Sequence, residues 1–270
     1  MNPEGRVMNG SGSCRENIDG FVKNPINSDG RIKIVTKTYA LTLNIRRYNP
    51  DRAASWVQTY KLDAGPILRF VDLFRRINVE QDATLAWASS CEHAQCGSCS
   101  VNVNGRPMLA CELLVENAVT LFGTTTFKIA PVSVAPLVRD LVVDWEQAYE
   151  RVHRAKPYLI KPKEVPAGMT EHRISPQELA RYEEATRCIN CFCCAEACIS
   201  GNRTFIGPNA AMAGIVRLMD PREEEKGERL DLLYSEKGIY RCHSSKACSH
   251  VCPKQIDVAH FVALAKEGAF

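Results

Sequence analysis

The residues best suited to chemistry in this 270-residue chain are its cysteines, of which there are 13. Twelve of them fall in three short runs, and only Cys14 stands apart, near the N-terminus. The chain is longer than the small secreted domains in which many cysteines indicate disulfides, and clustered thiolates are typical metal ligands. We therefore expect the three runs to hold metal centres and Cys14 to have no such role.

The first run has the spacing Cys91-x4-Cys96-x2-Cys99, with Cys111 following later. This spacing is typical of plant-type [2Fe–2S] centres, in which one loop supplies three thiolates. The glycine and serine after Cys96 are small and let backbone N–H groups approach the sulfur atoms, which stabilises the more negative reduced state. A zinc site is the alternative, but zinc runs favour paired CxxC motifs and fit the x4 gap poorly.

The second and third runs predict two further iron–sulfur centres. The second, Cys188-x2-Cys191-x2-Cys194-x3-Cys198, has the spacing of a bacterial ferredoxin cubane. In the third run, the four ligand positions of the ferredoxin spacing are occupied by Cys242, Ser245, Cys248 and Cys252, and Pro253 follows. The second ligand position therefore holds a serine in place of a cysteine.

In two-cluster ferredoxins the fourth cysteine of each run ligates the other cluster. This rule assigns a [4Fe–4S] cluster to Cys188, Cys191, Cys194 and Cys252. The remaining three thiolates, from Cys198, Cys242 and Cys248, indicate a [3Fe–4S] cluster. Ser245 as an alkoxide ligand of a fourth iron stays open as the alternative. Cys193 is left over, and we expect it to pack beside the cluster or to make a weak S–H contact.

The bulk composition excludes several other classes of protein. A net charge of +3 is too small to indicate a nucleic-acid or membrane-surface binder. The sequence has no run of about 18 apolar residues, so we expect no transmembrane helix. The polar N-terminus shows neither the apolar region of a Sec signal nor a twin-arginine pair.

We expect a mobile tail over residues 1–30. A mixed α/β region is expected to follow over residues 31–140, and its strands and helix position the first cysteine run. Alternating or β-branched residues predict strands at 32–36 and 40–46, the second ending at the turn signal Asn49-Pro50-Asp51. Helical spacing predicts a helix over 67–77. Strands at 100–103 and 108–110 flank the hairpin signal Asn104-Gly105.

The region 141–270 is expected to be all-helical. Its predicted helices cover 138–152, 209–219, 230–235 and 258–266, together with one that opens at the capping box Ser175-Pro176-Gln177-Glu178 and runs to about residue 186. Three prolines predict an extended connector over 156–167. The charged segment Glu223–Arg229 is expected to be a surface loop.

These motifs, in this order, resemble the iron–sulfur subunit of succinate dehydrogenase and fumarate reductase, the complex II family. The resemblance covers roughly residues 38–265 and rests on all three cysteine runs. It also rests on segments 138–144 (VRDLVVD), 156–160 (KPYLI), 205–208 (FIGP) and 241–243 (RCH).

The resemblance implies an α+β chain, with a plant-type [2Fe–2S] ferredoxin (β-grasp) domain followed by a helical domain with [4Fe–4S] and [3Fe–4S] clusters. It implies electron relay between the FAD of a succinate/fumarate flavoprotein subunit and a quinone site formed with membrane-anchor subunits, on the inner, cytoplasmic face of the membrane. The chain would have no catalytic residues of its own. His243 corresponds to a quinone-proximal histidine in some members, and a structural hydrogen-bond donor is the alternative.

One departure from the family concerns the segment after Cys198, which is short and contains no tryptophan, whereas many members carry a quinone-site tryptophan there. The segment is more similar to that of fumarate reductases with a di-haem cytochrome b anchor. It is also compatible with a soluble flavoenzyme, such as a thiol-dependent fumarate reductase. The same subunit design serves succinate oxidation and fumarate reduction.

Overall fold

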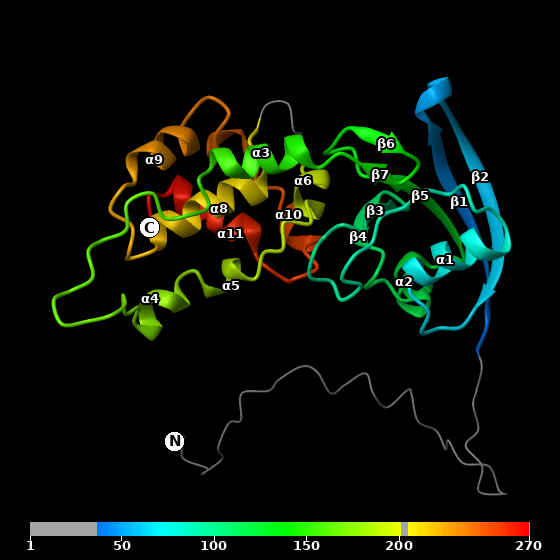
Figure 1. The fold of residues 1–270 in the computed structure, drawn as a ribbon, viewed down its shortest axis with the longest axis horizontal. Helices are drawn as coiled ribbons and strands as arrows, with labels where there is room; N and C mark the ends of the chain where they lie inside the picture. Colours follow the sequence, from blue (N-terminus) through cyan, green and yellow to red (C-terminus); the bar gives the residue numbers. More distant parts are fainter. Residues whose placement is uncertain (1–36, 201–204, 270) are drawn as a thin grey trace, which may run out of the picture. The chain divides into compact units, whose positions relative to one another are not determined.

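The computed structural model describes residues 37–200 and 205–269 (Figure 1). The tail predicted over residues 1–30, the strand predicted over 32–36 and Cys14 lie outside the described residues. Thr38–Phe270 forms one compact unit. Its buried apolar residues form two clusters, one in the sheet-containing first half and one in the helical second half. The boundary at residue 140 stays a prediction.

The first half is built on a five-stranded sheet with the order β2-β1-β5-β3-β4. Strand β1 pairs antiparallel with β2 and parallel with β5, and β3 pairs antiparallel with β5 and β4. Alternation explains β1, because Leu41, Leu43 and Ile45 are buried while their neighbours are not. The strands are β1 (Tyr39–Asn49), β2 (Ala54–Ala64), β3 (Ser100–Val103), β4 (Arg106–Leu109) and β5 (Thr126–Pro131).

Two helices, α1 (Phe70–Glu80) and α2 (Val115–Phe122), contribute to the same core. In α1, Phe70 packs edge-on against Phe127 of β5, with ring centroids 5.3 Å apart. The helix begins three residues later than predicted because Arg69 is extended and its N–H donates to the Asp72 carboxylate.

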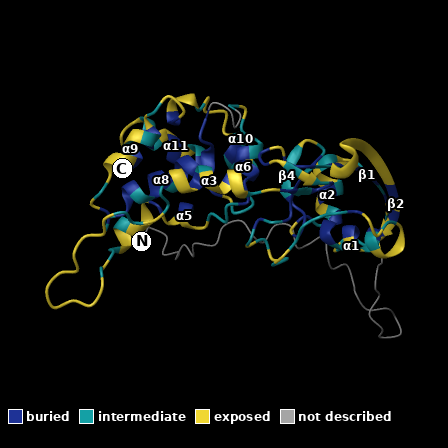
Figure 2. Ribbon diagram, turned by 45° about the horizontal axis from the view of Figure 1, so that its top comes forward, coloured by how far each residue is buried: buried dark blue, intermediate teal, exposed yellow. Residues whose placement is uncertain are grey.

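The hairpin predicted between residues 100 and 110 is present. Asn104 and Gly105 both have positive φ, 49° and 86°, as a two-residue turn with right-handed strand twist requires. The predicted turn after Tyr48 is also present, as the short 3₁₀ helix η1 (Pro50–Arg52) that joins β1 to β2. The first six residues of β2, which follow this turn, are exposed (Figure 2).

The single helix predicted over 138–152 is wrong in its first half. The chain instead forms a small hairpin, β6 (Leu137–Arg139) and β7 (Val142–Val143), before helix α3 (Glu146–Arg154). Asp140, at the turn, has a left-handed φ of 48°. Its buried carboxylate accepts hydrogen bonds from the N–H groups of Tyr48 and Ala86, both at 2.9 Å, and pairs with Arg47 at 2.9 Å. These contacts fix a turn where the apolar pattern alone suggests a helix.

The second half is helical, as predicted, and α8 (Pro208–Met219) is largely buried and packs on α3 and α11. The predicted capping box is confirmed: Ser175 accepts from the Glu178 N–H, and Glu178 accepts from that of Ser175. The other elements are α4 (Pro176–Ala180), α5 (Glu183–Thr186), α6 (Cys193–Glu196), α9 (Gly227–Leu233), η2 (Ile239–Arg241), α10 (Ala247–His250) and α11 (Val258–Lys266). No helix among the described residues is long and apolar enough to cross a bilayer.

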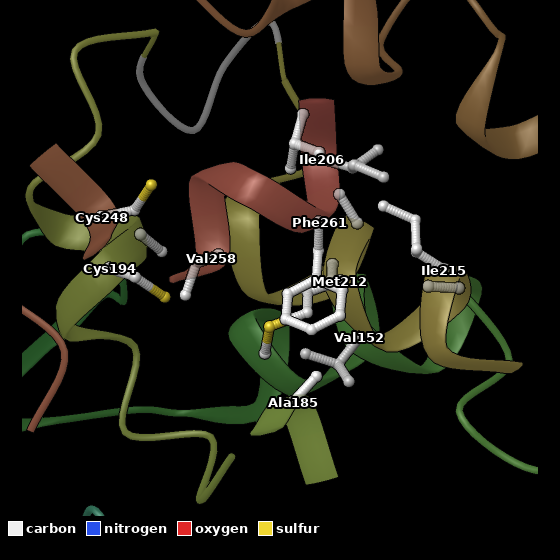
Figure 3. Packing of buried hydrophobic residues seen from close by; sticks show 14 of the residues in the cluster. Val152, Ala185, Cys194, Ile206, Met212, Ile215, Cys248, Val258 and Phe261 are labelled. Carbon is white, nitrogen blue, oxygen red and sulfur yellow. The ribbon is translucent and has the colours of Figure 1, made fainter. Parts of the chain in front are cut away.

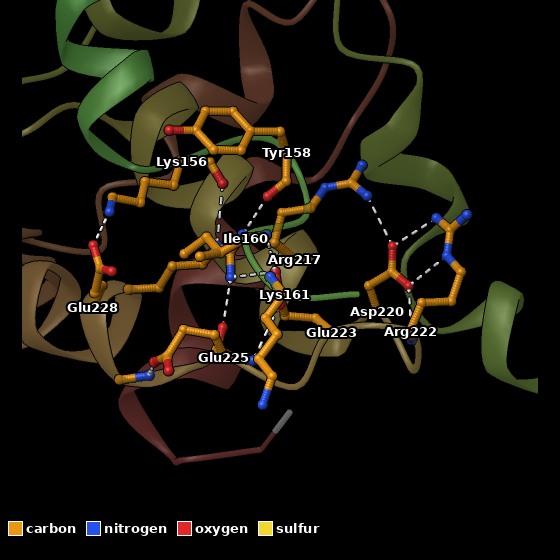
Figure 4. Close-up of polar contacts among 12 residues, drawn as sticks. Lys156, Tyr158, Ile160, Lys161, Arg217, Asp220, Arg222, Glu223, Glu225 and Glu228 are labelled. Atoms are coloured by element: carbon orange, nitrogen blue, oxygen red, sulfur yellow. Dashed lines mark hydrogen bonds and ion pairs between the residues drawn. The ribbon is translucent and has the colours of Figure 1, made fainter. Parts of the chain in front are cut away.

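The expectation that Glu223–Arg229 is a surface loop is wrong at both ends, because Glu223 is buried and α9 begins at Gly227 and includes the buried Arg229. Glu223 and Arg229 are 2% and 1% exposed and form a 2.8 Å ion pair. Figure 4 shows Glu223 beside Ile160 and Lys161, whose N–H groups donate to its carboxylate at 2.8 and 2.9 Å. Burial alone would raise the pKa of Glu223. However, the N–H groups of Ile160 and Lys161 and the Arg229 guanidinium hold it below the usual range. The pair thereby fastens the connector that begins at residue 156 to the segment before α9.

Candidate iron–sulfur sites

The loop between α1 and β3 carries three of the four thiols assigned to the first centre. It turns its backbone N–H groups inward by using left-handed conformations at Glu92, Ala94 and Gly97. The Cys91 sulfur accepts hydrogen bonds from the N–H groups of residues 93 and 95, at 3.4 and 3.3 Å. Such donors stabilise negative charge on sulfur, as a reduced cluster requires.

The fourth thiol, Cys111, follows β4 and closes this loop. The Cys111 N–H donates to the Cys99 sulfur at 3.4 Å, and the Cys111 sulfur accepts from the Ala94 N–H at 3.3 Å. Burial raises the pKa of Cys99 to about 12. Burial also opposes ionisation of Cys96, but hydrogen bonds, first from the Ser98 hydroxyl at 3.2 Å, lower its pKa to about 6. The structure therefore relates the four predicted thiols in pairs: Cys96 is a neighbour of Cys91, and Cys99 is a neighbour of Cys96 and Cys111.

Arg69, which caps the N-terminus of α1, and Arg75 within the helix hold the outside of this loop. The Arg69 guanidinium donates to the Glu92 carbonyl at 3.0 Å, and Arg75 pairs with the Glu92 carboxylate at 2.6 Å. Both arginines also bind Asp72. The loop is thus fixed by side chains from the helix that precedes it.

The thiols assigned to the [4Fe–4S] cluster line one apolar cavity in the helical region. The cavity wall includes Cys188, Cys191 and Cys194 together with Cys252, which comes from a run more than fifty residues later. Burial raises the pKa of Cys188 to about 11, and the charges of Cys191 and Cys252 add to that shift. The cavity contains all four thiols that the crossed-ligand rule selects and none of the other cysteines.

The three thiols assigned to the last centre also act on one another. Burial raises the pKa of Cys248, and Cys242 and Cys198 are the neighbouring thiols that contribute to the shift. The Cys242 sulfur accepts the Ser244 N–H at 3.4 Å. In Figure 3 the sulfur atoms of Cys194, on α6, and Cys248, on α10, point in different directions, as ligands of two different clusters should.

Ser245 and His243 lie in the exposed loop between Cys242 and α10. The Ser245 hydroxyl accepts the Ala247 N–H at 3.5 Å, a local contact at the N-terminus of α10. Over residues 37–200 and 205–269, no three His, Cys, Asp or Glu side chains form a group that could hold a metal ion. The ligand sets therefore stay predictions, supported by the neighbour relations among the thiols.

The structure shows a contact between two buried residues near the first two centres, which the sequence did not predict. Ser100, at the start of β3, is 3% exposed, and Cys193, at the start of α6, is fully buried. Their side chains are 3.8 Å apart, although they belong to different halves of the chain. The sequence signals for them were weak: Ser100 is one of two polar residues in the short strand Ser100–Val103, and Cys193 is a cysteine outside the ligand spacing.

A ferredoxin-like sheet domain and a helical region with crossed thiols together define an iron–sulfur electron carrier. Comparisons with known proteins agree. A family model described as a 2Fe-2S iron-sulfur cluster binding domain matches residues 42–150. A model described as a 4Fe-4S dicluster domain matches residues 184–256.

Individual relatives make the family more specific. The mitochondrial succinate dehydrogenase [ubiquinone] iron-sulfur subunit 2 of Oryza sativa subsp. japonica is 33% identical over 231 residues, which are 82% of this chain and 72% of that protein. The succinate dehydrogenase iron-sulfur subunit of Coxiella burnetii is 30% identical over 228 residues, 81% of this chain and 92% of that protein. A chain in the structure of the Mycobacterium smegmatis Sdh1 complex in the apo form matches with a TM-score of 0.75 at 27% identity, covering 86% of this chain and 96% of that one. This chain belongs to the family of succinate dehydrogenase iron–sulfur subunits.

Proposed function

We propose that this chain relays electrons between the FAD of a succinate/fumarate flavoprotein subunit and a membrane quinone site. The observation that carries the proposal is the crossed arrangement of thiols. Cys252 joins the second run at one cavity, which leaves Cys198 to join the third run. This arrangement divides the thiols of the helical region into two adjacent centres, and the loop at Cys91–Cys99 supplies a third.

The ligands we propose are those that the spacing predicts. The [2Fe–2S] cluster is held by Cys91, Cys96, Cys99 and Cys111. The [4Fe–4S] cluster is held by Cys188, Cys191, Cys194 and Cys252, and the [3Fe–4S] cluster by Cys198, Cys242 and Cys248. When bound, these clusters exchange one electron at a time, which suits a carrier between a two-electron flavin and a distant acceptor.

The protein's own contribution is the environment of each thiol. N–H donors at the Cys91 and Cys111 sulfurs favour the reduced state of the first centre. The last centre has three thiolates rather than four, so less ligand charge opposes its reduction. A cluster that is easier to reduce is well placed at the quinone end of the relay.

The proposed partners follow from the family. A flavoprotein subunit would bind the ferredoxin domain, and a membrane-anchor subunit, of the di-haem cytochrome b type, would bind near the last centre on the inner face of the membrane. His243 is exposed and adjacent to Cys242, which is compatible with a place near the quinone.

Metal analysis and paramagnetic resonance of the purified native complex test this proposal. We expect about nine irons per chain and a three-iron signal in the oxidised protein. Cys248→Ala should abolish the three-iron signal, whereas Cys193→Ala, the matched control at a cysteine outside the ligand sets, should keep the full iron content. Zinc in place of iron would contradict the cluster assignment. Reduction of fumarate by thiols, with no turnover of quinone, would instead favour a soluble flavoenzyme.

A further inference from the structure

The ferredoxin domain and the helical region meet where two proposed ligand loops touch. Gly97 lies in the first loop with a φ of +74°, and a Cβ there would lie 2.6 Å from the Cα of Cys191. A distance below 3 Å means that no side chain fits between the two backbones. The loop of the first centre therefore rests directly on the backbone of a ligand of the second.

The Ser100 hydroxyl joins these two backbones. Its oxygen lies 2.8 Å from the Gly97 carbonyl oxygen and 2.9 Å from the Cys191 carbonyl oxygen, with the hydroxyl as the donor in each contact. Both carbonyls can only accept, so the single hydroxyl proton is shared between them. Ser100 is buried, so water does not compete for these contacts.

Cys193 supplies the second proton of this group. Its sulfur lies 3.8 Å from the Ser100 oxygen, and the Cys191 side chain is its other hydrogen-bonding neighbour. Because the Ser100 proton is engaged by the carbonyls, the single Cys193 proton can go either to the Ser100 oxygen or to the Cys191 sulfur. A ligating Cys191 carries negative charge and is then the stronger acceptor, because hydrogen bonds to charged groups are about twice as strong as neutral ones.

We propose that Ser100 and Cys193 are positioning residues for electron transfer between the first two clusters. Ser100 holds the loop of the [2Fe–2S] cluster against Cys191, and the Cys193 thiol donates to the Cys191 sulfur and stabilises the reduced [4Fe–4S] cluster. This inference rests on the ligand assignment in the proposed function, and it adds roles for two residues that bind no iron.

Redox titration of the native complex, followed by paramagnetic resonance, tests the role of Cys193. Cys193→Ala should shift the reduced-to-oxidised ratio of the [4Fe–4S] cluster about tenfold toward the oxidised form, which lowers its potential by about 59 mV. Cys193→Ser restores a donor and should recover part of the shift. Ser98→Ala is the matched control, because Ser98 contacts Cys96 at 3.2 Å and its loss should lower only the [2Fe–2S] potential.

The role of Ser100 has its own readout. In the reduced complex, each paramagnetic cluster broadens the signal of its neighbour, and this effect falls steeply with distance. Ser100→Ala should weaken the broadening between the first two clusters, and Ser100→Thr, which keeps the hydroxyl, should preserve it.

The outcomes separate the two proposals. Wild-type protein without the expected iron and signals would contradict the ligand assignment itself. Intact clusters with an unchanged [4Fe–4S] potential in Cys193→Ala, or with unchanged broadening in Ser100→Ala, would overturn the positioning role alone. If Ser100→Ala loses a cluster, the variants Cys193→Ala and Cys193→Ser still test the proposal, because neither changes a residue of the ferredoxin domain.

Discussion

The buried ion pair between Arg229 and Glu223 should be among the most sensitive positions outside the iron–sulfur sites. Arg229 donates to Glu223 at 2.8 Å, to the Glu225 carbonyl at 2.9 Å, to the Lys156 carbonyl at 3.1 Å and also to the Tyr158 carbonyl. Arg229→Met keeps much of the apolar packing and removes all four of these contacts. Breaking one side of a buried pair typically costs about 3–5 kcal/mol.

The structure indicates the lower end of this range. Glu223 would keep three backbone donors, from residues 160, 161 and 225, so its carboxylate would not be left bare. We expect a loss of about 3 kcal/mol in the free energy of unfolding, which is a fall of roughly 6–12 °C in Tm for a chain of this size. The effect should be local at first, because Arg229 and Glu223 both hold the connector at residues 156–161.

Hydrogen exchange read by mass spectrometry is the appropriate assay, because loss of clusters on heating makes thermal unfolding irreversible. Amides at positions 160 and 161 should lose most of their protection in Arg229→Met. In the double variant with Glu223→Gln, part of the protection should return, since no unpaired charge remains. Glu224→Gln is the control: its pair with Lys161 is 40% and 70% exposed, and its loss should cost less than about 1 kcal/mol. Equal protection in Arg229→Met and the control would refute the reasoning.

Three further changes should have measurable effects. Gly97→Ala should separate the ferredoxin loop from Cys191, because the new Cβ would lie 2.6 Å from that backbone and φ is +74°. Limited proteolysis should then cut between the two halves of the chain faster than in the control Gly123→Ala. At Gly123 φ is +63°, but no atom lies within 4 Å of the added Cβ. Ser245→Cys supplies the missing thiolate of the last centre, so the three-iron signal should disappear and the iron content should rise from about nine to about ten. Arg47→Met leaves two carboxylates without their guanidinium, one of them 2% exposed, and should destabilise the sheet region by about 3 kcal/mol in urea unfolding.

The cysteine spacing could predict which thiols would be neighbours because ligand spacing is a local property, and the ligand sets themselves stay predictions. Three thiols on one loop must lie close together whatever the rest of the chain does, and the crossed rule then extends this to Cys252 and Cys198. What spacing cannot predict is how one loop packs on another. The contact of Gly97 with Cys191, and the hydroxyl of Ser100 between them, depend on how the two halves pack together.

The fold was predictable where periodicity was clear and unpredictable where polar contacts decide. Strand β1 follows from its alternating core residues, but β2 was missed because its first six residues are all exposed and show no alternation. Strand β5 and helix α2 lie in one apolar stretch without a clear period. The failed helix at 138–152 and the failed surface loop at Glu223 have the same cause: a buried carboxylate satisfied by backbone N–H groups and an arginine, which composition alone cannot reveal.

The lengths of the helices suggest why the crossed ligand arrangement suits the second half of the chain. Helices α5, α6 and α10 have only four residues each, too few for an isolated helix to be stable in water. Each lies beside or within a cysteine run, and in the proposed ligand sets each run shares ligands with the other through Cys198 and Cys252. Binding of either cluster would therefore close a loop of more than forty residues and contribute to folding as well as to electron transfer. A substitution at one of these two crossing ligands should thus disturb both clusters, whereas a substitution within the Cys91 loop should leave the helical region folded.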